Sequence, residues 1–132
     1  MRIDERMNSP QSTKELLAIS KEMAEAGRGK YTGQTAAGCT ANVCLIAGGQ
    51  VYVANAGDSK AVGCSVNGKP LTLSTDHKPS LKAERDRIQK AGGSLIEGRI
   101  EGNLNLSRAL GDFTFKRNSK LPPEEQMIIA EP

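Results

Sequence analysis

The sequence has few side chains with which to fill a hydrophobic core. Its 132 residues include two phenylalanines, two tyrosines and no tryptophan, and aromatic side chains are among those that bury the most surface. Leu, Ile, Val and Phe together number 26, close to the level below which chains often fail to fold. The length itself suits a single domain. The composition therefore raises the alternative that the chain is one part of a larger domain.

Histidine and cysteine are also scarce, which excludes several kinds of site. His77 is the single histidine, so histidine triads and multi-histidine zinc sites are excluded. The three cysteines, Cys39, Cys44 and Cys64, lack the C-x-x-C spacing of a zinc site. We expect them to be reduced, partly buried thiols.

The sequence lacks an excess of one charge and any long apolar run. The net charge of +3 does not indicate a nucleic-acid partner. The one dense basic cluster, Lys116, Arg117 and Lys120, is interpreted as a solvated loop, with contact to a polyanion as the alternative. The first ten residues are too charged for a signal peptide, and the longest apolar run, 43–47, is too short to cross a bilayer. We expect a cytoplasmic or nuclear protein without a membrane partner.

The segment 12–27 shows the pattern of a helix. Ser12 and Glu15 have the spacing of a capping box, and Gly27 provides a stop. The apolar side chains of the segment share one helical face, and they are Leu16, Ile19 and Met23. The Gly-rich segment 28–38 that follows is predicted to be a loop or linker.

A second helix is predicted over residues 80–93. Ser80 can cap it, Gly92 can end it, and Lys82 stands four residues before Asp86, which suits an ion pair on one face. The expected apolar stripe is narrow and consists of Leu81, Ile88 and Ala91. We therefore expect one face of this helix to dock and the other to be solvated.

The sequence predicts several short strands. Segments 40–47 and 50–56 are separated by Gly48 and Gly49, a pair that suits a tight hairpin turn. Because both segments are apolar on both faces, we expect the hairpin to be covered on both sides. A second strand pair is predicted at 60–66 and 70–74, short strands and turns at 94–107, and a Pro-containing loop at 121–127.

Asp58 is the strongest candidate for chemistry, because it follows a strand directly and stands between Gly57 and Ser59. Judged locally, such an aspartate is most often a turn residue that caps backbone N–H groups. The alternative is a ligand to a hard cation, which needs further oxygen ligands from other segments. For His77 the sequence leaves open a hydrogen-bonded turn residue and a proton shuttle.

Six stretches, taken together and in order, resemble a known family. They are "GCTANVCLI", "VYVANAGDSKAV", "LSTDHKP", "ERDRIQKAGGSL", "GRIEGNLNLSRALGDFTFK" and "LPPEEQM". Their order and spacing are similar to the middle of the type-2C class of metal-dependent serine/threonine protein phosphatases. The later stretches look most like the gamma-type eukaryotic branch. The resemblance covers residues 38–132.

The resemblance implies a fold and a division of the chain. The implied fold is an α/β sandwich of the α+β class, with four layers in the order α-β-β-α and mostly antiparallel sheets, of which this chain is a fragment. Residues 38–132 would form a partial catalytic domain. Residues 1–37 would form an N-terminal helix and a Gly-rich linker, to which the resemblance assigns nothing.

The resemblance also implies a chemistry, the hydrolysis of phosphoserine and phosphothreonine in proteins by a metal-activated water, with Mg²⁺ or Mn²⁺ as the cofactor. Asp58 matches the family aspartate associated with an additional metal ion, so it is the one candidate ligand. The "DGH", "DG" and "DN" stretches that hold the family's metal pair are not in this sequence. We therefore assign no catalytic residue, leave the substrate-binding residues unknown, and expect the fragment to be inactive alone.

Other matched positions depart from the family pattern or have structural interpretations. Lys60 stands where the family usually has arginine, which keeps the charge but loses planar bidentate pairing. Thr40 matches the family pattern and Cys39 replaces a Ser or Thr, both at strand positions. Arg108 and Asp112 are interpreted as scaffold residues, with substrate contact as the alternative.

A different class of function remains open from the sequence. The chain could be a non-catalytic, pseudophosphatase-like binding module that docks a partner through residues 113–127. The presence or absence of the "DGH" and "DG" stretches in a complete reading frame would distinguish this module from an enzyme.

Overall fold

The structure is a computed structural model that describes residues 3–28 and 37–132. The expected Gly-rich loop at 28–38 lies largely outside these residues. The helices are α1 (Ile3–Met7), α2 (Pro10–Glu25) and α3 (Lys82–Lys90), with 3-10 turns η1 (Phe113–Phe115) and η2 (Pro123–Glu125). The strands are β1 (Gly38–Cys39), β2 (Ala41–Ala47), β3 (Gln50–Ala56), β4 (Val62–Cys64), β5 (Pro70–Thr72), β6 (Leu95–Ile96), β7 (Arg99–Ile100) and β8 (Leu110–Gly111).

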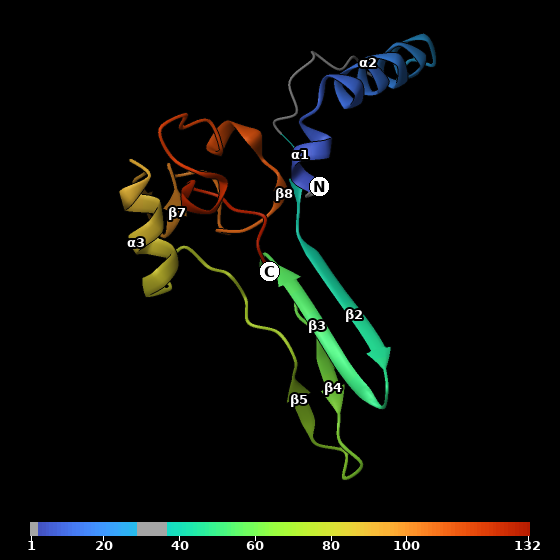
Figure 1. Cartoon of the computed structure of the whole chain (residues 1–132), viewed down its shortest axis with the longest axis vertical. Coiled ribbons are helices and arrows are strands. Elements are labelled where there is room, and N and C mark those ends of the chain that lie inside the picture. The colour runs from blue at the N-terminus through green and yellow to red at the C-terminus, as the bar shows by residue number, and fades with distance from the viewer. Residues whose placement is uncertain (1–2, 29–36) are drawn as a thin grey trace.

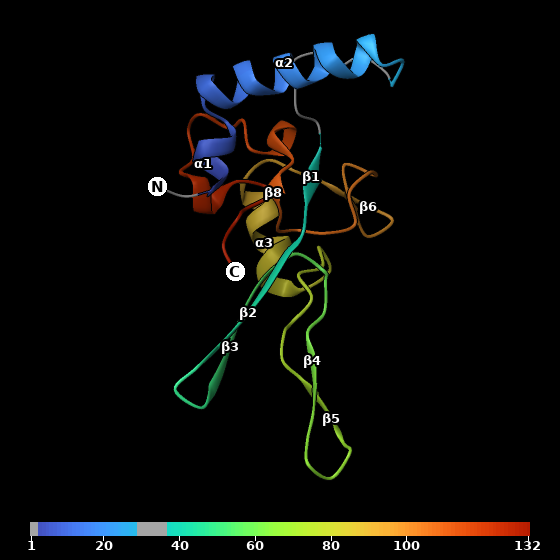
Figure 2. The same cartoon turned by 90° about the vertical axis from the view of Figure 1, so that its right-hand side faces the viewer.

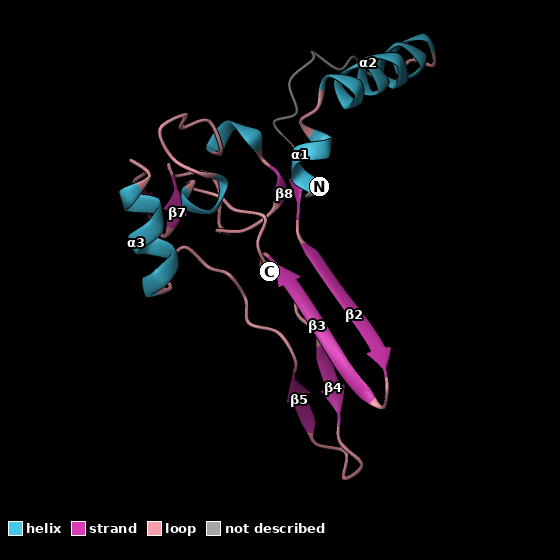
Figure 3. Cartoon of the chain, viewed as in Figure 1, coloured by secondary structure: helices cyan, strands magenta, loops and turns pink. Residues whose placement is uncertain are grey.

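The elements form a body from which two hairpins extend (Figures 1 and 2). The body consists of α3, the β6/β7 pair, β8 and the C-terminal segment, and loops make up much of it (Figure 3). The β2/β3 and β4/β5 hairpins extend from one end of this body, and α2 lies at the other end (Figure 2). All four strand pairs are antiparallel.

Helix α2 begins earlier than the sequence pattern predicts. Ser9 is the N-cap, its Oγ accepts a hydrogen bond from the Ser12 N–H at 3.2 Å, and Pro10 occupies the first helical turn. The expected capping box of Ser12 and Glu15 is therefore wrong, because Pro10 already has the fixed φ of a helix start. The helix ends as expected, with Gly27 at φ +70°.

The β2/β3 hairpin has the predicted register and turn. Ala47 pairs with Gln50, and Gly48 and Gly49 adopt φ values of +57° and +74° between them. The expected cover on both sides is absent among the described residues. Large apolar side chains of the hairpin are exposed, and they are Val43, Leu45, Ile46, Val51 and Tyr52. The two strands form a sheet of their own, and the buried residues of the hairpin are confined to the end of β3, at Asn55 and Ala56.

The hydrophobic core lies between α3 and the segments that follow it. Ile88 of α3 packs with Ile100, Ala109 and Ile128, all fully buried. The cap of α3 is Leu81, which makes no side-chain cap hydrogen bond, so the expected cap at Ser80 is wrong. The partly buried side chains packed around this core are Leu95, Leu104, Leu106, Phe115 and Met127. The body is therefore the one part of the described structure with a packed interior.

The exposed face of α3 carries the predicted ion pair. The ion pair between Lys82 and Asp86 forms, with Nζ and Oδ2 2.6 Å apart. The three cysteines are free, as expected, but they are exposed rather than partly buried. Helices and antiparallel strand pairs confirm the α+β class. Within residues 3–28 and 37–132, no helix has the length and apolar character needed to cross a membrane.

Candidate functional site

The candidate site is the turn that follows β3. The strand ends because Gly57 adopts φ +115°, a conformation that other residues rarely tolerate. A Cβ atom on Gly57 would stand 2.4 Å from Thr40 Cγ2 and 3.0 Å from the Arg108 carbonyl oxygen. The backbone therefore passes so close to its neighbours that only glycine fits. Asp58 is the next residue, and its side chain is 22% exposed.

Two asparagines hold this turn in place. The buried Asn55 donates from Nδ2 to the carbonyl oxygens of Gly57 at 3.0 Å and Thr75 at 2.8 Å. Asn42 on the neighbouring strand donates to Asn55 Oδ1 at 3.0 Å and to the Ser59 carbonyl at 3.3 Å. These amides satisfy carbonyl oxygens around the turn, a role that the carboxylate of Asp58 could not fill because it only accepts hydrogen bonds.

The charged side chains around the turn are paired with the segment 76–78. Lys78 Nζ donates a hydrogen bond to Asp58 Oδ2, and the two form an ion pair. Lys60 Nζ lies 3.2 Å from Asp76 Oδ1, with the lysine side chain half exposed. The carboxylates of Asp58 and Asp76 thus each face an ammonium group in this structure. Partly exposed pairs of this kind contribute little to folding and can exchange partners.

His77 joins the turn to the body. Its backbone N–H donates to the Gly57 carbonyl at 2.9 Å, and its Nδ1 accepts from the Gly57 N–H at 3.3 Å. Burial lowers the pKa of His77, and the positive charge of Arg108 lowers it further. The neutral ring is therefore favoured, and its unprotonated Nδ1 is the acceptor for the Gly57 N–H. These contacts fit the hydrogen-bonded turn residue better than the proton shuttle.

The other residues singled out from the sequence have structural partners. Thr40 Oγ1 and Ser59 Oγ are 2.6 Å apart. Cys39 pairs with Leu110 in the short β1/β8 sheet. Asp112 is buried at φ +50°, and burial raises the pKa of its carboxyl group. These contacts agree with the structural and scaffold interpretations of Thr40, Cys39 and Asp112.

The described residues do not form a metal centre by themselves. No group of three or more His, Cys, Asp or Glu side chains with the geometry of a metal site occurs in the part of the chain that the structure describes. Asp58 brings one carboxylate, and that carboxylate is paired with Lys78. A hard cation needs several oxygen ligands, so residues outside this set would have to complete any site at Asp58.

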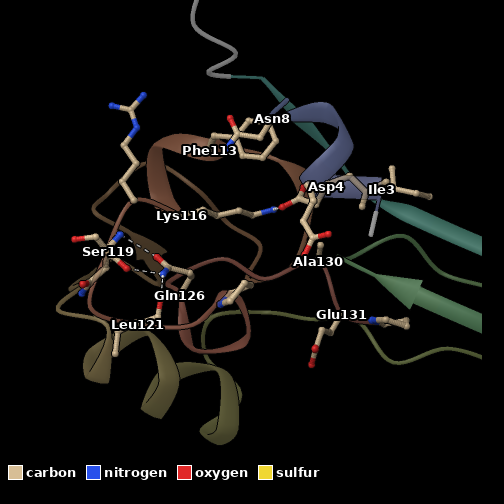
Figure 4. Close-up of a pocket in the computed structure, with 16 residues that line it drawn as sticks. Ile3, Asp4, Asn8, Phe113, Lys116, Ser119, Leu121, Gln126, Ala130 and Glu131 are labelled. Carbon is tan, nitrogen blue, oxygen red and sulfur yellow. Dashed lines mark hydrogen bonds and ion pairs between the residues drawn. The ribbon is translucent and has the colours of Figure 1, made fainter. Parts of the chain in front are cut away.

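Lys116 and Arg117 of the basic cluster line a cavity of about 820 Å³ (Figure 4), and Arg117 and Lys120 are exposed. Lys116 is 8% exposed and forms an ion pair with Asp4 of α1. Its Nζ also lies 5.5 Å from the centre of the Phe113 ring. Burial takes Lys116 out of a solvent-facing basic patch, whereas Arg117 and Lys120 are exposed, as both the solvated loop and the polyanion contact require. Sequence reasoning missed Asp4, since no local pattern links it to a residue 112 positions away.

The comparisons with known proteins agree among themselves. Residues 2–132 match the family model described as "Protein phosphatase 2C". This match includes residues 2–37, to which the sequence analysis assigned no family. The "Probable protein phosphatase 2C 3" of Paramecium tetraurelia is 47% identical over all 132 residues, which are 41% of that protein. The "Probable protein phosphatase 2C 11" of Oryza sativa subsp. japonica is 55% identical over 108 residues, 82% of this chain and 29% of the relative.

A solved structure supports the same relationship. A phosphatase from Toxoplasma gondii matches 75% of this chain and 42% of its own length, with a TM-score of 0.59 and 33% identity. The chain thus spans about 41% of the length of the curated Paramecium relative that it matches along its whole length.

Proposed function

The chain belongs to the protein phosphatase 2C family, and from this premise we propose that it works as the central part of a metal-dependent serine/threonine protein phosphatase. The substrates would be phosphorylated proteins, the ions Mg²⁺ or Mn²⁺, and the compartment the cytoplasm or nucleus. The relatives are longer than this chain, so the proposal concerns a catalytic domain that other segments complete.

The turn after β3 is the observation that carries this proposal. Asp58 is partly exposed, while the backbone that presents it is fixed by Asn55, Gly57 and His77. A rigid turn that holds one carboxylate at the surface is suited to contribute one ligand to a shared site. Because the described residues form no group of three or more candidate ligand side chains, no step of the hydrolysis is assigned to this chain alone.

The proposal can be tested in a chimaera. The 132 residues would replace the matching segment of the Paramecium relative, to which they are 47% identical, and phosphate release from a phosphothreonine peptide would be measured. We expect turnover with Mn²⁺ or Mg²⁺, loss of turnover with a chelator, and no turnover by the isolated chain. A folded chimaera that is inactive at every metal concentration would contradict the proposal.

Asp58 is tested in the same chimaera. Asp58→Asn keeps the size of the side chain but removes its charge, so we expect about a tenfold loss of turnover, roughly the effect of one lost charge contact. Asp86→Asn is the matched control, because Asp86 lies in an exposed pair on α3. Full turnover by Asp58→Asn at every metal concentration would make Asp58 a turn residue only.

The pairing of Asp58 with Lys78 favours a second candidate function, a non-catalytic binding module. A carboxylate already neutralised by a lysine needs no cation. This candidate predicts a chimaera that folds, lacks turnover, and retains binding to a phosphopeptide in the presence of a chelator.

A further inference from the structure

Glu84 is a buried carboxylate in α3 with an unusually complete set of donors. Its side chain is 3% exposed and accepts from Arg108 Nη2 at 2.7 Å, Arg87 Nη2 at 2.8 Å and Ser107 Oγ at 2.6 Å. Burial alone would raise the pKa of Glu84, but the donors of Arg108, Arg87 and Ser107 outweigh it and lower the pKa to about 2. The carboxylate is therefore ionised at neutral pH and fixes the residues that bind it.

The residues that Glu84 fixes are the ones against which the Asp58 turn is seated. The Ser107 N–H donates to the His77 carbonyl at 3.0 Å. The Arg108 carbonyl oxygen lies 3.0 Å from the position where a Gly57 Cβ would stand, so the two backbones are in close contact. A continuous path of contacts thus leads from Glu84 through residues 107 and 108 to Gly57.

We infer that Glu84 is a positioning residue for Asp58, because it fixes the 107–108 backbone that supports the turn carrying this carboxylate. The inference rests on the proposed function in one respect, the role of Asp58 in the site. The mechanical part of the inference, that the ionised Glu84 holds the Gly57 turn, can be tested without any catalytic activity.

The charge of Glu84 is essential to this role. Arg108 Nη1 also lies 3.2 Å from the Glu131 carbonyl, and Arg87 Nε lies 3.2 Å from the Gln126 carbonyl. Without an ionised Glu84 these guanidinium groups would keep their C-terminal contacts but lose the carboxylate that draws them toward α3. Removing one partner of a buried pair leaves the other charges uncompensated, so the 107–108 backbone is expected to shift or loosen.

The first test measures hydrogen exchange of the Gly57 amide by NMR in the folded chimaera, whether or not the chimaera is active. In Glu84→Gln we expect this amide to exchange about tenfold faster than in the wild type, with little change in β2 and β3, since local opening changes exchange only where contacts are lost. Ser107→Ala removes a single donor to Glu84 and should give a smaller increase. Asp86→Asn on the same helix should give none.

The exchange rate of the Gly57 amide decides whether Glu84 holds the Gly57 turn. Unchanged exchange at Gly57 in Glu84→Gln would overturn the inference, and so would an equal increase at Gly57 and throughout β2 and β3. If Glu84→Gln does not fold, Ser107→Ala decides the question by the same criterion.

The second test asks whether Glu84 acts through Asp58 in the chimaera. Asp58→Asn, Glu84→Gln and the double variant are compared by turnover per folded molecule and by the Mn²⁺ concentration that gives half-maximal rate. If Glu84 acts through Asp58, the double variant should be no less active than the less active of the two single variants, because the effects of coupled residues do not add. A double variant whose fold-loss of turnover equals the product of the two single losses would overturn the inference. An inactive chimaera would contradict the proposed function, while the exchange experiment would still decide the role of Glu84.

Discussion

Asp4 and Lys116 stand 112 positions apart, yet their carboxylate and ammonium groups lie 2.9 Å from each other (Figure 4). Their side chains keep only 16% and 8% of their surface exposed. The second carboxylate oxygen of Asp4 accepts from the Gly111 N–H at 2.8 Å, and Lys116 also donates to the Ala109 carbonyl at 2.8 Å. This ion pair therefore ties α1 to the segment around β8.

Asp4→Asn should destabilise the chain strongly. Burial lowers the pKa of Lys116 and the carboxylate of Asp4 raises it, so the variant leaves a mostly buried ammonium without its counter-ion. Breaking such a pair costs about 3 to 5 kcal/mol, which urea unfolding would measure. Asp86→Asn breaks an exposed pair and should leave the unfolding midpoint almost unchanged. Equal effects of the two variants would contradict a structural role for the Asp4 pair.

Gly57→Ala should cost more than a substitution at a glycine with open surroundings. Gly57 and Gly92 both have positive φ, +115° and +91°, but only Gly57 has atoms of Thr40 and Arg108 within contact distance of a new Cβ. We expect Gly92→Ala to lower the free energy of unfolding by about 1 kcal/mol through backbone strain, and Gly57→Ala to lower it by about 3 kcal/mol through strain and steric overlap. Melting temperatures of the two variants provide the comparison.

The parts of the fold that local sequence determines could be predicted. The β2/β3 hairpin follows from Gly48 and Gly49 between two apolar segments, because the turn itself sets the register. The N-caps of α2 and α3 were predicted wrongly, since Ser9 rather than Ser12 caps α2 and no side chain caps α3. The prediction that both faces of the hairpin are covered was also wrong. Apolar faces indicate that a strand is suited to burial, but they do not show whether the same chain supplies the surface that packs against it.

The candidate site was predicted in part. Asp58 and the glycine before it were identified at a strand end, and the metal-binding role of Asp58 stays a prediction. Glu84 was missed because a glutamate three residues before Arg87 on a helix is typical of an exposed ion pair. Its other partners, Ser107 and Arg108, are 23 and 24 residues away, and only the folded chain brings them together.

The exposed apolar hairpin predicts self-association of the isolated chain. Ile46 is 74% exposed and Leu45 58% exposed on a two-stranded sheet, and exposed apolar strands with free edges tend to associate. We expect oligomers at micromolar concentration in sedimentation velocity, and fewer of them in Ile46→Lys. Val66→Lys is the control, because Val66 is fully exposed in a turn. A wild type that stays monomeric and melts cooperatively would contradict this prediction.

The cysteines provide a test of the same open arrangement. Cys39, Cys44 and Cys64 are all free and exposed. We expect three thiols to react with a disulfide reagent in the native chain, without denaturation or prior reduction, since accessible thiols react through their thiolate forms. A count below three in the native chain, rising to three on denaturation, would show that another surface covers β1, β2 or β4.

Removing the charge of Asp112 should stabilise the chain. Burial raises the pKa of its carboxyl group above the ordinary 3.8, Lys116 opposes this shift and Asp4 adds to it. The ionised carboxylate of Asp112 therefore destabilises the fold at neutral pH. This penalty disappears as pH falls below 3.8, because Asp112 is then protonated in both the folded and the unfolded chain. Asp112→Asn, which tolerates the positive φ, should melt at a higher temperature than the wild type at pH 7, and the difference should vanish in acid.

Glu84→Gln should have the opposite pH dependence. The folded pKa of Glu84 is about 2 against the ordinary 4.5, so the carboxylate stabilises the fold fully above pH 4.5 and loses this contribution as pH falls toward 2. At neutral pH the shift corresponds to stabilisation on the order of 3 kcal/mol. We expect Glu84→Gln to be less stable than the wild type at pH 7 by that order, with the two converging as pH falls from 4.5 toward 2. A difference that stays constant over this range would mean that the size or packing of the side chain stabilises the fold, and would remove the electrostatic basis for the link from Glu84 to Asp58.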